Sequence, residues 1–199
     1  MVELALAEIG ADYEFITVDL RQAEQRDDAF ASVNPQRKLP ALEMPDGTMI
    51  TESAAILLML DRLHPAAGLL PGDETADYAT ALRWLIFVAA ECYPLVEISD
   101  YPERFAPDGA ENAGIVREKA RELWRQRWLI VEANIAGDHS LLARGCCATD
   151  FAIAVVSRWA QQDDWRAHNT PKIDAIADAV ANRPATDEAW QRNFPPENA

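Results

Sequence analysis

Basic residues are scarce in this sequence. It holds 18 Lys and Arg against 33 Asp and Glu, a formal net charge of −15. An acidic surface repels phosphate backbones and anionic headgroups, so we expect neither nucleic acid nor membrane as a partner. The apolar run at residues 54–60 is also far shorter than the roughly 20 residues that span a bilayer. An acidic protein that binds an anion needs local cations, which draws attention to Arg37 and Lys38.

Cysteine and histidine are also few, with three of each in 199 residues. Three cysteines, two of them adjacent, do not form a disulfide framework, and we expect a reducing, cytoplasmic setting. The histidines show no metal-ligand spacing, so no metal site is predicted. The sequence has no Gly-rich phosphate loop and no Gly-x-Ser-x-Gly elbow. The first residues, lacking a basic segment, do not resemble a signal peptide.

The most informative stretch is Asn-Pro-Gln-Arg-Lys-Leu-Pro-Ala-Leu at residues 34–42. Apolar residues at 39–42 and 49–50 predict two short strands, and Asp46-Gly47 between them is a hairpin signal because glycine accepts positive φ. A helix is predicted over 54–63, because that segment has no helix breaker and a hydroxyl residue stands ahead of it as a cap.

This stretch also suggests a ligand. Pro40 stands where a strand begins and is a position at which prolines are sometimes cis; a cis bond would leave the Leu39 backbone groups pointing outward. An extended peptide could pair with that edge. Free N–H groups at Glu52 and Ser53 and the positive helix end would hold one carboxylate, and Arg37 or Lys38 a second. Such a site suits a short, extended, doubly acidic peptide.

Around this stretch the chain divides into two parts. Hydrophobic periodicity predicts helix, strand and helix before the hairpin, and then a segment dense in Pro and Gly that is typical of a linker. All later elements are predicted helices, with Cys92 in the core and the last-but-one helix buried on most faces. The predicted elements are helix 2–9 with a stop at Gly10, strand 13–18, helix 19–31, linker 65–74, and helices 75–98, 112–136, 148–160 and 171–182.

The pattern Asn-Pro-x-x-Lys-Leu-Pro-Ala-Leu, then Asp-Gly, then Thr-Glu-Ser-Ala-Ala-Ile resembles the glutathione-binding half of the glutathione transferase family over about twenty positions. The resemblance implies that Leu39 pairs with the cysteinyl backbone of glutathione and that Pro40 is the family's cis-proline. It further implies that Glu52 and Ser53 bind the γ-glutamyl end and that Lys38 lies near the glycine carboxylate. Arg37 departs from the family, in which many members have Gly there.

The resemblance implies an α+β thioredoxin-like domain over residues 1–64, the linker at 65–74, and an all-α domain over 75–199. The family's first β-strand, whose loop carries the catalytic Ser, Tyr or Cys, has no counterpart, so no catalytic residue is assigned. Two explanations remain open: an N-terminally shortened form of a longer transferase, or a genuine short member. The missing central strand would leave unpaired backbone groups, at about 1–3 kcal/mol for each one that is buried. Local rearrangement, a partner's segment or water could fill the gap.

Further expectations follow from the same resemblance. The family conjugates glutathione, as co-substrate, to small electrophiles in detoxification, and its members are commonly homodimers. The chain as given is expected to be weak or inactive. A non-catalytic scaffold and a glutathione-dependent isomerase or peroxidase are the alternatives. The aromatic residues Trp84, Tyr93, Tyr101 and Phe105 would line the electrophile site or serve as core, with equal weight on each.

The segment Cys147-Ala148-Thr149-Asp150 matches the position of the family's capping box. Asp150 could accept a hydrogen bond from the backbone N–H of Cys147. A thiol accepts hydrogen bonds weakly, so we predict a cap about 1 kcal/mol weaker than serine would give. A reactive thiolate at this helix end is the alternative to a small packing residue, and packing is the favoured interpretation.

Overall fold

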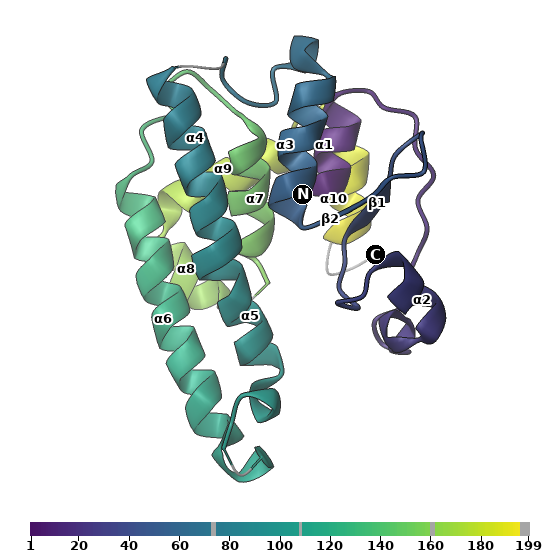
Figure 1. Ribbon diagram of the computed structural model, residues 1–199. Helices are drawn as coiled ribbons and strands as arrows, with labels where there is room; N and C mark the ends of the chain where they lie inside the picture. Colours follow the sequence, from purple (N-terminus) through teal and green to yellow (C-terminus); the bar gives the residue numbers. More distant parts are fainter. Residues whose placement is uncertain (73–74, 108, 160–161, 196–199) are drawn as a thin grey trace.

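The computed structural model describes residues 1–72, 75–107, 109–159 and 162–195. Its first part begins with a short helix, continues through a loop and another short helix to a β-hairpin, and ends with a longer helix (Figure 1). The helices and strands of this part are α1 Val2–Glu8, α2 Asp28–Val33, β1 Ala41–Glu43, β2 Met49–Thr51 and α3 Ser53–Leu63, with a 3₁₀ turn at Glu24–Arg26. The predicted hairpin and the helix that follows it are therefore confirmed.

The sheet in the described part of the chain consists of β1 and β2 alone, paired antiparallel with Leu42 opposite Ile50. The prediction of a strand at 13–18 is wrong: residues 11–19 have no regular secondary structure. A strand exists only when a neighbour completes its ladder, and no described strand lies beside this segment. Phe15 and Ile16 are accordingly 51% and 75% exposed.

The first helix forms as predicted because its apolar residues share one face. Val2, Ala5 and Leu6 are buried, and Gly10, just after the helix, has φ +65°, a conformation that glycine adopts without strain. The prediction of a continuous helix over 19–31 is wrong in extent. Only the 3₁₀ turn and α2 form, because Ala23 takes a left-handed φ of 59° just before the turn and Asp27, between the turn and α2, has an extended backbone with ψ 153°.

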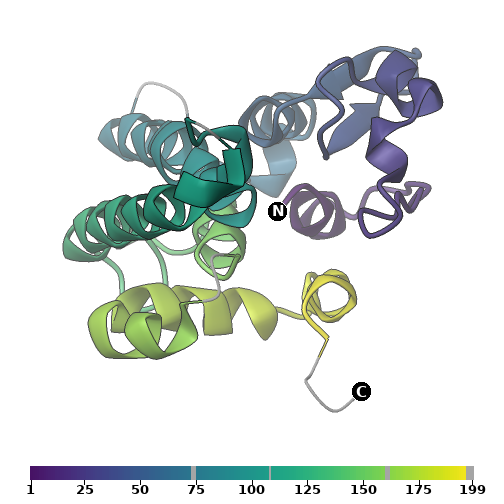
Figure 2. The same ribbon diagram turned by 90° about the horizontal axis from the view of Figure 1, so that it is seen from below.

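In the described residues of the second part, helices are the only regular structure. The helical run that contains α4 and α5 lies alongside α6 on one side of the molecule, and α10 lies next to α1 on the other (Figures 1 and 2). The segments are α4 Ala76–Phe87, a π-helical turn Val88–Cys92, α5 Tyr93–Asp100, α6 Ala113–Ala133, α7 Ala148–Val156, α8 Asp163–Asn169, α9 Pro171–Ala181 and α10 Asp187–Asn193, with 3₁₀ turns at Pro65–Ala67, Pro102–Arg104 and Gly109–Asn112.

The predicted helix at 75–98 is confirmed, with one feature that the periodicity did not indicate. Val88–Cys92 is a π-helical turn directly before Pro94. Proline cannot donate a backbone hydrogen bond, and its ring clashes with the carbonyl four residues earlier in an α-helix. The wider π turn relieves this conflict, and π turns of this kind are frequent at functional sites.

The continuous helical run Ala76–Asp100 is the one helix in the described ranges that is long and apolar enough to cross a membrane by composition alone, with a mean hydropathy of 1.4 in its most apolar window. In the structure it packs along α6 and α7 and places Ala81, Trp84, Leu85, Val88 and Cys92 in the core. Inside the structure 39% of that window is buried, so packing accounts for part of its apolar content. The prediction for Cys92 is confirmed.

The centre of the core is α7, in which every residue is buried. Asp150 accepts hydrogen bonds from the N–H groups of Cys147 (2.8 Å) and Leu141 (2.6 Å), as the capping pattern predicted for Cys147. The helix ends at Val156, earlier than predicted, and residue 160 lies outside the described ranges. The predictions for 112–136 and 171–182 are confirmed as α6 and α9, while α8 and α10 were not predicted.

The segment predicted as a linker contains the 3₁₀ turn Pro65–Ala67 and little other regular structure; residues 73–74 of it lie outside the described residues. Leu70 N–H donates to Asp61 of α3 at 2.8 Å, and Leu69 C=O accepts from Ala148 N–H of α7 at 2.6 Å. These bonds fasten the segment to both parts of the chain. The division into domains at 1–64 and 75–199 stays a prediction.

Candidate functional site

Asn34 organises the loop that carries the predicted cationic residues. It is 3% exposed, and its Oδ1 accepts from Gln36 N–H at 3.0 Å while its Nδ2 donates to Lys38 C=O at 2.7 Å. Its own carbonyl accepts from Arg37 N–H at 2.8 Å. Asparagine commonly starts turns in this way, because its short side chain bonds the backbone two residues later. The loop is therefore fixed in shape before any ligand arrives.

The peptide bond between Leu39 and Pro40 is cis, as the sequence suggested. Met44 N–H donates to Thr48 C=O, and bonded pairs alternate in an antiparallel ladder, so the Leu42–Ile50 pair is bonded as well. The backbone groups of Ala41 and Glu43 then face the free side of β1. Glu43 is exposed and Ala41 is half-buried, so solvent reaches this edge and the expected penalty for buried unpaired groups is largely avoided.

The start of α3 lies directly beside Pro40, because Ala41 is paired with Thr51. Glu52 precedes the helix with φ 66° and ψ 110°, a strained conformation for a residue other than glycine. No side chain caps this helix end. Along α3, Ile56 is the first residue whose N–H donates to a backbone carbonyl, that of Glu52. The preceding N–H groups and the helix dipole therefore present positive potential at Ser53, which is 8% exposed.

The two segments singled out in the sequence are also joined by side chains. Gln36 Nε2 donates to Glu52 Oε1 at 3.1 Å. The structure thus brings together Arg37, Lys38, Leu39, Pro40, Glu52 and Ser53, the residues predicted to bind glutathione. Their roles as ligand contacts stay predictions.

The two predicted cations both have partners within the chain. Arg37 Nη2 lies 2.9 Å from Asp28 Oδ1, and Lys38 Nζ lies 2.7 Å from Glu97 Oε2 on α5. Arg37 has φ 56°. In this left-handed region glycine is favoured, which explains physically why glycine suits the position. The lysine pair connects the loop to the helical part of the chain.

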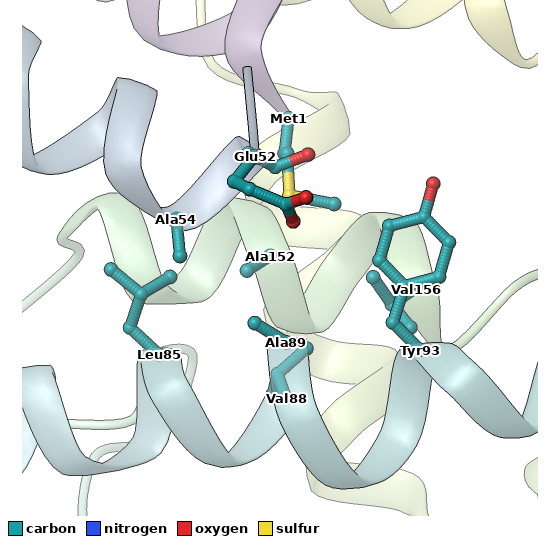
Figure 3. A pocket seen from close by; sticks show the side chains of 10 residues that line it. Met1, Glu52, Ala54, Leu85, Val88, Ala89, Tyr93, Ala152 and Val156 are labelled. Atoms are coloured by element: carbon teal, nitrogen blue, oxygen red, sulfur yellow. The ribbon is translucent and has the colours of Figure 1, made fainter. Parts of the chain in front are cut away.

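A cavity opens beside the start of α3 (Figure 3). Its floor is apolar, and its rim carries Glu52 and the Tyr93 ring. The Tyr93 hydroxyl points away from the floor. The lining consists of Met1, Glu52, Ser53, Ala54, Leu85, Val88, Ala89, Tyr93, Ala152 and Val156. The cavity therefore combines an uncapped helix start with an apolar surface.

Tyr93 is the aromatic residue that reaches this cavity. Its ring packs on Trp159 with centroids 4.9 Å apart. Burial, together with Glu52 and Glu97, raises its pKa, so the hydroxyl stays protonated and can donate a hydrogen bond. Among the other aromatic candidates, Trp84 is 1% exposed and belongs to the core, while Tyr101 and Phe105 are 41% and 47% exposed.

The cysteine alternative is not supported. Cys147 is buried at the start of α7, and burial raises its pKa well above that of a free thiol. The same cause raises the pKa of Cys92 and Cys146 to about 12. A thiol in such a setting is poorly nucleophilic, so the packing interpretation holds.

Two residues of this site were missed by the sequence reasoning. Asn34 was quoted in the motif without a role, although an Asn-Pro pair is a recognisable turn start. Glu97 could not have been found, because it lies 59 residues from Lys38 and no local pattern connects them.

A thioredoxin-like part with a free strand edge, followed by helices, is the architecture of glutathione transferases. Residues 1–63 match the family described as glutathione S-transferase, N-terminal domain. The chain is 30% identical to the uncharacterized GST-like protein YncG of Escherichia coli (strain K12) over 96% of this chain and 91% of that protein. It is also 36% identical to maleylacetoacetate isomerase of Pseudomonas aeruginosa over 98% and 91%. The chain belongs to the glutathione transferase family.

Solved structures agree with this assignment. A sphingomonad glutathione S-transferase complexed with glutathione is 28% identical, with a TM-score of 0.73 over 98% of this chain and 94% of that one. A glutathione transferase homolog from Sulfitobacter, with bound glutathione, has a TM-score of 0.87 over 96% and 91%; at 24% identity it supports the fold alone. The predicted fold class, a thioredoxin-like part followed by a helical bundle, is confirmed, and the protein is glutathione transferase-like.

Proposed function

We propose that this protein binds glutathione along the free edge at residues 39–43 and conjugates it to small electrophiles. The observation that carries the proposal is the Ala41–Thr51 pairing, which sets the Leu39–Pro40 bend beside the start of α3. Neither backbone group of Leu39 has a hydrogen-bonded partner in the described part of the chain. A peptide can therefore pair with Leu39 while its carboxylate meets the helix end at Ser53.

The chemistry is a substitution or addition at carbon. The thiol proton passes to solvent, and the thiolate forms a carbon–sulfur bond with the electrophile. In a substitution the leaving group departs with its bonding electron pair; in an addition the π electrons move onto the acceptor, which takes up a proton from solvent. The protein contributes position, and the positive end of α3 favours negative charge nearby. The apolar cavity floor, including Val88 and Ala152, suits an apolar electrophile, and Tyr93 offers one hydrogen-bond donor at the rim.

A carboxylate placed at the start of α3 tests the proposal. In Ser53→Asp the new charge would repel the γ-glutamyl carboxylate, whereas an acidic residue in the first helical turn does not weaken the helix. We expect at least tenfold weaker glutathione binding by calorimetry. Ala55→Asp, an exposed position in the same turn, is the matched control and should bind as the parent does. Equal binding by all three proteins would disprove the proposed site.

Glutathione-dependent isomerisation is the second candidate. The 36% identity to the Pseudomonas isomerase over nearly the whole chain favours it. In that reaction the thiolate adds to a conjugated double bond, the single bond rotates, and the thiolate leaves again. Assaying conjugation of an aryl halide and isomerisation of a cis-enone diacid side by side separates the two activities. Glutathione binding without either reaction would favour a scaffold.

A homodimer in the cytoplasm completes the proposal. Exposed apolar side chains that could face a second copy occur on both parts of the chain, among them Met59 of α3 (39%) and Ile86 of α4 (45%). Three free cysteines suit a reducing compartment. Light scattering coupled to gel filtration gives the oligomeric state, and a monomer at micromolar concentration would count against this arrangement.

A further inference from the structure

Glu97 lies between two cations at the boundary between the binding loop and the helical part. Its Oε2 is 2.7 Å from Lys38 Nζ, and its Oε1 is 3.6 Å from Arg104 Nη1. The Arg104 guanidinium also stacks over the Tyr101 ring at 4.0 Å. The carboxylate of Glu97 therefore already forms an ion pair with Lys38, the lysine of the candidate site.

This arrangement conflicts with a simple role for Lys38 in anion binding. A lysine that receives a ligand carboxylate binds best when its charge is free, but here an internal carboxylate already holds it. The Lys38 side chain is 56% exposed and Glu97 is 29% exposed, so the lysine is the partner more accessible to an incoming ligand. Glu97 therefore competes with any ligand carboxylate that approaches Lys38.

We propose that Glu97 is a specificity-determining residue that weakens recognition of the glycine carboxylate of glutathione. This inference rests on the proposed function. When the ligand draws Lys38 away, Glu97 keeps Arg104 as its partner, so its charge is not left alone. The exchange of one half-exposed ion pair for another changes the free energy little. The parent protein then distinguishes only weakly between tripeptides with and without a free glycine carboxylate.

The test compares two ligands, glutathione and its glycine monoethyl ester, by calorimetry. In Glu97→Gln the competing charge is gone and the side chain keeps its size, so we expect glutathione to bind about two- to fivefold more tightly. The ester lacks the carboxylate in question, and its affinity should not change. In the double variant with Lys38→Gln, the gain should disappear, because the gain acts through the lysine ammonium.

Glu91→Gln is the matched control. It removes the same charge from the π-helical turn of the same helical run, where Glu91 pairs with Arg127 at 2.9 Å. Its affinities for both ligands should equal those of the parent. If Glu97→Gln leaves glutathione affinity unchanged, or tightens the acid and the ester equally, the inference is overturned. If the folded parent binds neither ligand, the proposed function fails instead, so the two failures are distinguishable.

Discussion

Replacing Asn34 by alanine removes the two side-chain hydrogen bonds that shape the binding loop. The Lys38 carbonyl and the Gln36 N–H both lose their partner. The backbone bond from Arg37 N–H to Asn34 C=O remains, so the turn is loosened without being abolished. The variant therefore isolates the contribution of the side chain to the shape of the site.

The size of the effect follows from the burial of the two groups. Asn34 is 3% exposed, and its bond to the Lys38 carbonyl is partly buried, so that loss costs about 1–2 kcal/mol. The Gln36 N–H lies at an exposed residue, where water replaces the lost partner and the cost is about 0.5 kcal/mol. We expect the free energy of unfolding to fall by roughly 1.5–2.5 kcal/mol.

Two measurements check this expectation. Urea denaturation gives the loss of stability, and calorimetry with glutathione should show at least fivefold weaker binding, because the loop must be ordered before Leu39 can pair with a ligand. Asn134→Ala is the control, since Asn134 makes one exposed bond to the Ile130 carbonyl far from the site. It should change stability by no more than about 0.5 kcal/mol. An Asn34→Ala protein as stable as this control would refute the reasoning.

Three further outcomes are expected. Burial raises the pKa of Asp150 from 3.8 to about 6, so the folded state holds the proton more tightly than the unfolded state does. The contribution of this proton to the free energy of unfolding is complete below pH 3.8 and is lost as the pH rises through 6. Asp150→Asn should therefore flatten this part of the curve of stability against pH. Cys147→Ser should raise the free energy of unfolding by up to about 1 kcal/mol in urea, and an unchanged or lower value contradicts the cap argument. Arg37→Gly should raise the melting temperature by relieving a positive φ that costs about 1 kcal/mol, and a fall in that temperature contradicts the strain.

Local patterns predicted the elements whose interactions are local. The hairpin and α3 depend on residues within a short stretch, and each was found; the cis bond before Pro40 was implied by the resemblance to the family. The strand at 13–18 depended on a neighbour supplied from elsewhere, so its β-forming composition alone did not produce a ladder. The helix α10 Asp187–Asn193 was not predicted, and its contacts reach distant segments, as in the ion pair between Arg192 and Glu3 of α1.

The candidate site divides in the same way. Residues 34–40 and 52–53 could be grouped from the motif, because the hairpin between them fixes their separation. The partner of Lys38 and the position of Tyr93 depend on how α5 packs against the loop. Periodicity places Tyr93 on a helix but does not indicate the π-helical turn that precedes it. The features of the site that the sequence did not reveal therefore depend on packing between distant segments.

The contact between α1 and α10 joins the two ends of the chain. Glu3 accepts from Asn193 Nδ2 at 2.7 Å and pairs with Arg192, and Glu8 pairs with Arg183. A ribosome that has made α1 and the binding loop has not yet made α10, so α3 covers α1 early in synthesis and the contact with α10 forms only later. Tags or proteolytic nicks near residue 190 should consequently disturb α1 and the candidate site more than their distance along the chain suggests.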